Sequence, residues 1–276
     1  MEIRAKKSLG QHFLRSKAAI EKIVMAGQLS WGETVLEIGP GKGVLTEALL
    51  LAGARVIAVE TDIDCITFLE QRFEHEIEEK RFLLIAGDIR KHELQKKLFD
   101  KKFLGSGRYK LIANIPYYIT GMLFRLFLET LRQPELIVFL VQKEVAQEIV
   151  ARDGKEGILS LSVKAYGSPR MVGIVKREAF SPPPKIDSAI IAVENISRKR
   201  FSGDEERRFF ETVKAGLGSR RKMLIGNLAQ KLNITRTILL ERFIALQIDP
   251  GTRGEDLSTE KWFTLSRALL KDEMEG

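Results

Sequence analysis

Residues 34–60 have the sequence TVLEIGPGKGVLTEALLLAGARVIAVE, which predicts a strand, a glycine turn, a helix and a second strand in succession. Thr34 to Ile38 and Arg55 to Glu60 are short apolar runs of strand length, whereas Val44 to Ala52 has helical periodicity. The glycines between Gly39 and Gly43 permit a tight turn from strand to helix. A strand–helix–strand unit of this kind indicates a parallel sheet covered by helices.

The same alternation continues to about residue 152. We expect further strands at 82–86, 109–114 and 136–141, and helices at 17–28, 63–73, 120–131 and 143–152. After Gly154 the pattern changes, because three β-like runs follow without helices between them, at 159–165, 171–175 and 189–193. The sequence therefore predicts an α/β fold with a mostly parallel sheet and an antiparallel edge.

The chain becomes charged from about Ser197 and then shows only helical periodicity, at 205–217, 221–232, 236–246 and 259–271. We place a domain boundary near Arg198. The prediction is a larger α/β domain over residues 1–197 and a small helical domain over residues 198–276.

Composition limits the class of protein. A chain of 276 residues with 44% hydrophobic and 30% charged residues is typical of a globular protein, and a net charge of +8 favours an anionic partner such as nucleic acid. The single cysteine, Cys65, excludes an intramolecular disulfide, and the three histidines show no metal-ligand spacing with it. No signal peptide is recognisable, and no apolar run approaches the about 20 residues that span a bilayer. We expect a cytoplasmic protein without a metal.

Three successive strands end in residues suited to a nucleoside cofactor. The turn over residues 37–43 has the spacing G-x-G-x-G rather than the G-x-G-x-x-G of dinucleotide sites, so a nucleoside with an amino-acid tail fits better. Glu60 ends the second strand, where a carboxylate can accept both ribose hydroxyls. Asp88 follows the third strand and can accept a hydrogen bond from an adenine amino group.

Residues 114–117, Asn-Ile-Pro-Tyr, end the next strand. The Asn114 side-chain oxygen and a neighbouring backbone carbonyl can both accept hydrogen bonds from one exocyclic amino group. Pro116 stiffens the turn, and the ring of Tyr117 offers a stacking face. This segment predicts a site for a flat heterocycle that carries an amino group.

With these motifs assembled, the chain resembles the bacterial small-subunit (16S) rRNA adenine N6-dimethyltransferases of the KsgA/RsmA type. The resemblance runs from Lys7 to about Leu270 and rests on residues 11–14, 37–43, 60, 87–88, 114–117, 180–188, 220–222 and 253–258. One departure is His12, where the family more often has Asn.

The resemblance implies a seven-stranded, Rossmann-like methyltransferase sheet with a helical C-terminal domain that docks on rRNA. It implies that His12 and Leu14 close over the methionine end of S-adenosyl-L-methionine, with Gly39 beneath it. Glu60 would hold the ribose, Asp88 the adenine amine, and Asn114 both cofactor and substrate. Tyr117 and Phe180 would stack on the target adenine, and Arg220, Arg221 and Lys222 would contact RNA.

The implied reaction is methyl transfer to N6 of two adjacent adenines in the 3′-terminal loop of small-subunit rRNA, on the RNA or on a pre-assembled subunit, with a role in subunit biogenesis. We expect a monomer. A large-subunit rRNA adenine methylase of the macrolide-resistance type shares the motifs at 114–117 and 180–184, but residues 220–222 and 253–258 favour the small-subunit family. A ribosome-assembly factor with secondary enzymatic activity is the other alternative.

Overall fold

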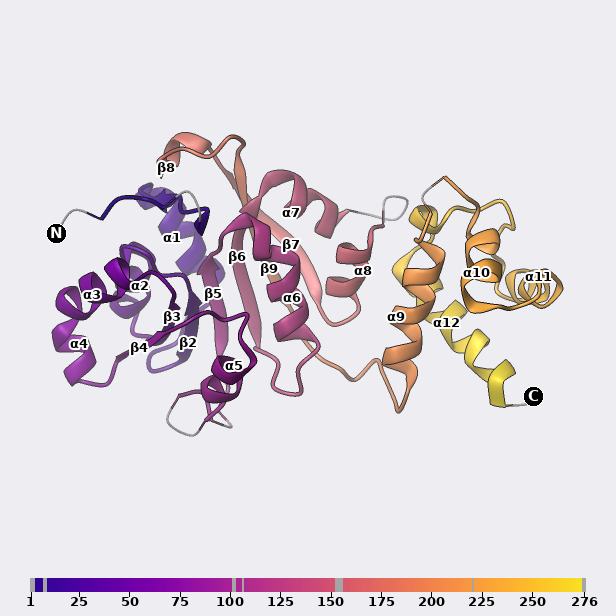
Figure 1. Cartoon of the computed structure of the whole chain (residues 1–276), viewed down its shortest axis with the longest axis horizontal. Helices are drawn as coiled ribbons and strands as arrows, with labels where there is room; N and C mark the ends of the chain where they lie inside the picture. The colour runs from indigo at the N-terminus through magenta and orange to yellow at the C-terminus, as the bar shows by residue number, and fades with distance from the viewer. Residues whose placement is uncertain are drawn as a thin grey trace. The chain divides into compact units, whose positions relative to one another are not determined.

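The computed structural model describes residues 3–6, 9–100, 103–105, 107–151, 156–219 and 221–274. The chain forms two compact units (Figure 1). The first consists of Met1–Ala146 and Ser168–Ile196, and the second of Gln147–Gly167 and Ser197–Gly276. The chain therefore leaves the first unit after Ala146 and returns to it at Ser168, so the second unit includes a segment that lies before our predicted boundary near Arg198.

The first unit contains a seven-stranded sheet with the strand order β4-β3-β2-β5-β6-β9-β7 (Figure 1). The strands are β2 (Thr34–Ile38), β3 (Arg55–Glu60), β4 (Phe82–Ala86), β5 (Lys110–Asn114), β6 (Leu136–Gln142), β7 (Ser168–Val175) and β9 (Ser188–Glu194). The five strands from β4 to β6 are parallel, whereas β9 pairs antiparallel with both β6 and β7. The predicted fold class, including the antiparallel edge, is confirmed.

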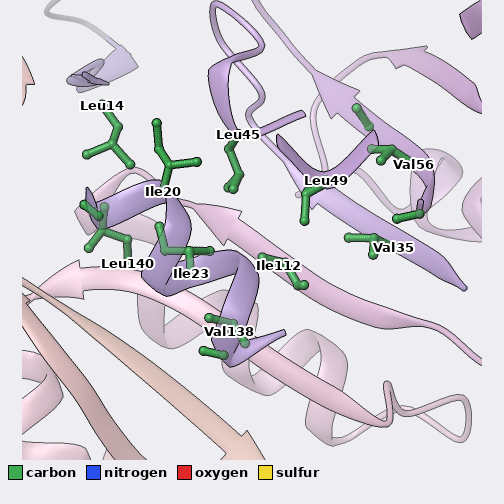
Figure 2. Packing of buried hydrophobic residues seen from close by; sticks show 14 of the residues in the cluster. Leu14, Ile20, Ile23, Val35, Leu45, Leu49, Val56, Ile112, Val138 and Leu140 are labelled. Carbon is green, nitrogen blue, oxygen red and sulfur yellow. The ribbon is translucent and has the colours of Figure 1, made fainter. Parts of the chain in front are cut away.

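Helices bury the sheet, which explains why its central strands are apolar on both faces. The helices of this part of the chain are α1 (Lys17–Ala26), α2 (Val44–Leu51), α3 (Ile63–Arg72), α4 (Glu74–Glu78), α5 (His92–Leu98), α6 (Thr120–Leu128) and α7 (Lys143–Val150). Val138 and Leu140 of β6 join a buried cluster with Ile23 of α1 and Leu49 of α2 (Figure 2). Phe139, which points to the opposite face, packs edge-on against Phe124 of α6 at 5.1 Å between ring centroids.

The order of the strands opens a crevice above the middle of the sheet. From β2 the chain continues through α2 to β3 on one side, whereas from β5 it continues through α6 to β6 on the other. The connections at the carboxyl ends of the neighbours β2 and β5 therefore diverge, and open α/β sheets bind ligands at such a point.

A second sheet of two short strands joins the start of the chain to a distant segment. In it, β1 (Phe13–Leu14) pairs antiparallel with β8 (Phe180–Ser181), and the Arg15 amide donates to the Ala179 carbonyl at 2.8 Å. These contacts hold residues 9–14, which we call the N-terminal arm, beside the crevice.

The second unit is helical and has an aromatic core. It contains α8 (Ile158–Lys164), α9 (Glu205–Gly216), α10 (Leu224–Leu232), α11 (Arg236–Ala245) and α12 (Thr259–Met274). Phe209 and Phe263 stack with ring centroids 4.4 Å apart, and Phe201 packs against both.

The predicted strand at 159–165 is wrong, because this segment is the helix α8. Its alternating sequence ILSLSVK matches strand periodicity, but the serines that look solvent-facing are buried. The Ser160 hydroxyl hydrogen-bonds to the Ile149 carbonyl at 3.3 Å and to the Glu156 carboxylate. Tertiary hydrogen bonds thus allow a small polar residue inside the unit, which the pattern alone does not reveal.

Candidate active site

A pocket opens at the carboxyl ends of β2, β3, β4 and β5, where the crevice was expected. It is lined by the N-terminal arm and by the segments that follow these four strands, namely residues 9–14, 37–42, 44–45, 59–61, 87–90 and 114–119. The predicted site residues His12, Leu14, Gly39, Glu60, Asp88, Asn114 and Tyr117 are all among the lining residues. The structure thus brings together residues that are more than a hundred positions apart in the sequence.

Glu60 holds the glycine turn in place. Its Oε1 accepts hydrogen bonds from the amides of Thr61 and Asp62 at 2.7 and 2.9 Å, and its Oε2 accepts one from the Gly41 amide at 3.0 Å. A carboxylate has about four acceptor positions, so Oε2 retains capacity for a hydroxyl donor. Gly39 has a φ of 70°, and a methyl group built on it would meet no atom within 4 Å. The turn therefore presents bare backbone to the pocket.

Asp88 forms a two-point ion pair with Arg90. The Arg90 guanidinium donates from Nε and Nη2 to the carboxylate at 2.9 and 2.6 Å, and the Arg90 amide donates to Oδ1 at 2.9 Å. These bonds hold the pKa of Asp88 below its ordinary value, although partial burial opposes them. Asp88 is therefore an ionised acceptor at neutral pH.

Asn114 and Tyr117 are each oriented by one hydrogen bond. The Asn114 Nδ2 donates to the His12 carbonyl at 3.3 Å, which leaves Oδ1 as the acceptor end of the amide. The Tyr117 hydroxyl bonds to the Ser188 hydroxyl at 2.6 Å, and its ring stacks on the His12 ring with centroids 6.2 Å apart. Burial raises the pKa of Tyr117, which outweighs the opposing effect of Ser188, so the phenol is neutral at physiological pH.

The N-terminal arm and Lys6, which precedes it, are anchored by contacts that were not predicted from the sequence. Lys6 Nζ lies 2.5 Å from Oδ1 of the buried Asp62, and Gln11 Nε2 donates to Oδ2 at 2.8 Å. The ring of His12 bonds through Nδ1 to the Pro182 carbonyl at 2.8 Å. The available signal in the sequence was Asp62, two positions after Glu60. Acidic residues clustered after a strand favour pairing with a basic residue.

Phe180 lies beside this site rather than in its wall. It is 4% exposed, belongs to the buried cluster that includes Leu14 and Val175, and is not among the lining residues. Its backbone pairs with Leu14 in the two-stranded sheet. Phe180 thus supports the arm in the arrangement described here.

Glu37 is a buried carboxyl in the wall of the pocket that was not singled out from the sequence as a site residue. The Thr46 hydroxyl donates to its Oε2 at 2.7 Å. Burial raises the pKa of Glu37 to about 8, the Thr46 bond opposes this rise, and the carboxylate of Glu60 adds to it. Its position directly before the glycine turn was the sequence signal.

This raised pKa predicts a pH dependence of stability. A group whose pKa is higher in the folded state contributes stability below its unfolded pKa and loses it as pH rises through the folded value. The contribution of Glu37 to the thermal unfolding temperature should therefore decline between about pH 4.5 and pH 8. In Glu37→Gln this decline should be absent. Calorimetry across this range measures it.

Glu33→Gln is the matched control with the opposite sign. Burial alone would raise the pKa of Glu33, but the ion pair with Lys110 at 2.7 Å and the Ser30 amide lower it. Its stabilisation is present above the unfolded pKa and lost as pH falls through the folded one, so this variant should be less stable than wild type near neutral pH and approach wild-type stability as the pH becomes acidic. A wild-type slope between pH 4.5 and 8 in Glu37→Gln would contradict the assignment.

The predicted RNA-contacting residues lie in the second unit. Arg221 and Lys222 are exposed, in the turn between α9 and α10, whereas Arg220 lies outside the described residues. The buried Asn227 donates to the Gly216 and Ser219 carbonyls at 2.7 and 2.9 Å and so fixes the start of this turn. Met223 forms a β-bridge with Arg253, which places Arg221 and Lys222 close in space to the start of the motif at 253–258.

Within the described ranges, no helix is long and apolar enough to cross a membrane. Nor do any three His, Cys, Asp or Glu side chains in the part of the chain that the structure describes group in a way that would hold a metal ion.

Comparison with known proteins identifies the family. Residues 2–271 match the family model described as ribosomal RNA adenine dimethylase. A Dehalococcoides mccartyi protein named ribosomal RNA small subunit methyltransferase A is 44% identical over 261 residues, which cover 94% of this chain and 87% of the relative. A protein of the same name from Thermosynechococcus vestitus is 38% identical over 275 residues, with 97% of each chain covered.

A solved structure agrees in fold. The dimethyladenosine transferase from Plasmodium falciparum superposes with a TM-score of 0.78 at 23% identity, covering 96% of this chain and 98% of that one. Sequence motifs, pocket and comparisons agree, and the chain belongs to the ribosomal RNA adenine dimethylase family.

Proposed function

We propose that this protein transfers methyl groups from S-adenosyl-L-methionine to N6 of two adjacent adenines in the 3′-terminal loop of small-subunit rRNA. The product is N6,N6-dimethyladenosine, and the reaction belongs to small-subunit biogenesis in the cytoplasm. The proposal rests mainly on one observation: the Asn114–Tyr117 turn lines the same pocket as the glycine turn, Glu60 and Asp88. The names of the curated relatives support the small subunit over the large-subunit alternative.

The pocket fits the cofactor residue by residue. The open backbone at Gly39 leaves room for the methionine end, which His12 and Leu14 cover from the N-terminal arm. The remaining acceptor capacity of Glu60 suits a ribose hydroxyl, and the ionised Asp88 suits the adenine amine. When bound, this cofactor supplies a methyl group on a positively charged sulfur.

Asn114 and Ile115 prepare the target nitrogen. The Asn114 Oδ1 and the Ile115 carbonyl would accept the two N–H groups of the adenine amine and so direct its lone pair toward the methyl group of the cofactor. Because the His12 carbonyl already engages Nδ2, the amide does not have to reorient to do this. The same oxygens stabilise positive charge that develops on N6, so catalysis consists mainly of positioning and electrostatics.

Tyr117 would stack on the extruded base. Phe180, which the family resemblance implies as the second stacking ring, is buried beside the pocket and would have to move to reach the base. Stacking on an aromatic ring contributes about 1–3 kcal/mol per base, which offsets the few kcal/mol needed to unstack it. The neutral phenol of Tyr117 does not act as a base, so the proton of the amine leaves to solvent.

The direct experiment is a methylation assay with purified small subunits and labelled cofactor. We expect label in two adjacent adenines of the small-subunit RNA, recovered as dimethyladenosine after digestion. Label only in large-subunit RNA would favour the macrolide-resistance type of enzyme. Binding to immature subunits without label would favour a pure assembly factor.

We further propose that the basic segment at residues 220–222 docks the enzyme on folded rRNA. Phosphate contacts position a protein without specifying sequence, and folded RNA is recognised largely by shape. Replacing Arg220, Arg221 and Lys222 with Gln should weaken subunit binding and lower the slope of log affinity against log salt by about 2–3, since each lost phosphate contact removes about 0.7–0.9. Cofactor affinity should be unchanged.

The control variant neutralises three other exposed cations of the second unit, Arg207, Lys214 and Arg236, and so has the same net charge. A filter-binding titration at several salt concentrations compares the two. Equal slopes in both variants would show that only the overall charge matters, and an unchanged slope in the first would exclude this segment from the interface.

A further inference from the structure

Two side chains at the mouth of the pocket have no assigned contact with the RNA in the mechanism above. Tyr118 and Arg90 both line the pocket, yet Tyr118 is 59% exposed and the Arg90 side chain 53% exposed. Tyr118 follows β5 and Arg90 follows β4. Neither was predicted from the sequence to be a site residue.

Tyr118 packs against the N-terminal arm and remains largely exposed. A methyl group built on Gly10 would lie 3.4 Å from Cε1 of the ring, so the backbone of the N-terminal arm packs against Tyr118. Its neighbour Tyr117 is directed instead toward Ser188 of β9 and the ring of His12. The two adjacent tyrosines therefore present their rings to different places, and Tyr118 leaves a large apolar surface in water.

Arg90 lines the same pocket and is held by an ion pair with Asp88. Asp88 engages its Nε and Nη2, and this ion pair keeps the pKa of Arg90 above its ordinary value, with a smaller contribution from the Tyr118 oxygen. The guanidinium is thus permanently charged and pre-oriented, and its Nη1 edge is left for an external acceptor. Arginine held in this way is well suited to a phosphate, because its planar donors match the oxygens.

The proposed substrate supplies the matching chemistry. When one adenine is extruded into the pocket, the nucleotide next to it loses a stacking partner. An exposed aromatic ring beside a fixed cation can accept such a nucleotide, with the base on the ring and the phosphate on the cation.

We propose that Tyr118 and Arg90 bind the nucleotide that adjoins the target adenine, Tyr118 by stacking on its base and Arg90 by contacting its phosphate. This inference rests on the proposed function. It assigns the two residues to substrate binding at the mouth of the pocket and leaves the cofactor to the residues described above. Because the target adenines are themselves adjacent, the pair would hold one while the other reacts.

The test for Tyr118 uses steady-state methylation of purified small subunits and calorimetric titration of the cofactor without RNA. Tyr118→Ala should raise KM for the subunit about 5- to 150-fold, the equivalent of one lost stacking contact, while cofactor affinity and kcat at saturating subunit are retained. Tyr118→Phe should behave like wild type because it keeps the ring. Trp31→Ala is the matched control, since Trp31 is 86% exposed and does not line the pocket.

The test for Arg90 is the salt dependence of subunit binding. Arg90→Gln should lower the slope by about 0.7–0.9, the value for one phosphate contact. Arg108→Gln is its control, because Arg108 also pairs with a carboxylate, that of Glu135 at 3.2 Å, but lies just before β5, at the opposite edge of the sheet. This control should keep the wild-type slope.

Three outcomes would overturn the inference: an unchanged KM in Tyr118→Ala, a loss of cofactor affinity in that variant equal to the change in KM, or a wild-type slope in Arg90→Gln. The second would assign Tyr118 to the cofactor site instead. Failure of the proposed function is distinguishable, because wild-type protein would then leave the small subunit unlabelled.

Discussion

Replacing Asn114 with alanine will lower kcat for methylation of the small subunit by about 100- to 1,000-fold, the loss typical for one oriented group that stabilises developing charge. The variant loses the only side-chain acceptor that the Asn114–Tyr117 turn directs at the amine. It also loses the hydrogen bond from Nδ2 to the His12 carbonyl, so the N-terminal arm is held less firmly and cofactor affinity will fall as well. Single-turnover rates with saturating cofactor separate the two effects.

Tyr117 provides the comparison for this experiment. Tyr117→Ala should lower turnover more than cofactor affinity, because the stacking face is removed. Tyr117→Phe should be mild, since it keeps the ring and loses only the bond to the Ser188 hydroxyl. Wild-type turnover in Asn114→Ala would exclude the amide from catalysis, and wild-type turnover in Tyr117→Ala would exclude base stacking there.

Replacing Glu60 with alanine will weaken S-adenosyl-L-methionine binding by about 10- to 150-fold, the range for one hydrogen bond to a charged group. The carboxylate also fastens the Gly41 amide, so its loss frees the glycine turn that forms the floor of the pocket. Affinity for the small subunit should stay near wild type. Calorimetric titration of the cofactor measures the first effect, and filter binding measures the second.

Glu47→Ala is the matched control for Glu60. Glu47 lies in the first turn of α2, close to the same glycine turn, but its carboxylate pairs with Arg72 at 2.9 Å and does not line the pocket. It should bind the cofactor like wild type. Unchanged affinity in Glu60→Ala would remove Glu60 from the cofactor site and leave it a purely structural role.

The sequence was sufficient for those parts of the fold and the site that depend on local pattern. The parallel strands are apolar runs of strand length, and Glu60, Asp88 and Asn114 are recognisable because each comes at or directly after the end of such a run. Parallel topology then brings these positions to one edge without any knowledge of tertiary contacts.

The sequence was insufficient where contacts between residues far apart in the chain determine the local structure or the role of a side chain. The segment around Ser160 has strand periodicity but is helical, because buried acceptors satisfy its hydroxyl. The pairing of β1 with β8 joins two-residue strands that are too short to show any periodicity. The roles of Lys6 and Gln11 depend on one buried carboxylate, Asp62, which no local pattern connects to the N-terminal arm.

The pairing of β1 with β8 also bears on when the enzyme becomes competent during its synthesis. The arm that covers the pocket leaves the ribosome first, but its partners Phe180 and Pro182 follow more than 160 residues later. Translation proceeds at about 5–20 residues per second, so for many seconds the arm has its contacts with Asp62 but lacks those with Phe180 and Pro182. Cofactor retention should therefore begin only after residue 182 has emerged. Activity would then start when synthesis of the first unit is nearly complete.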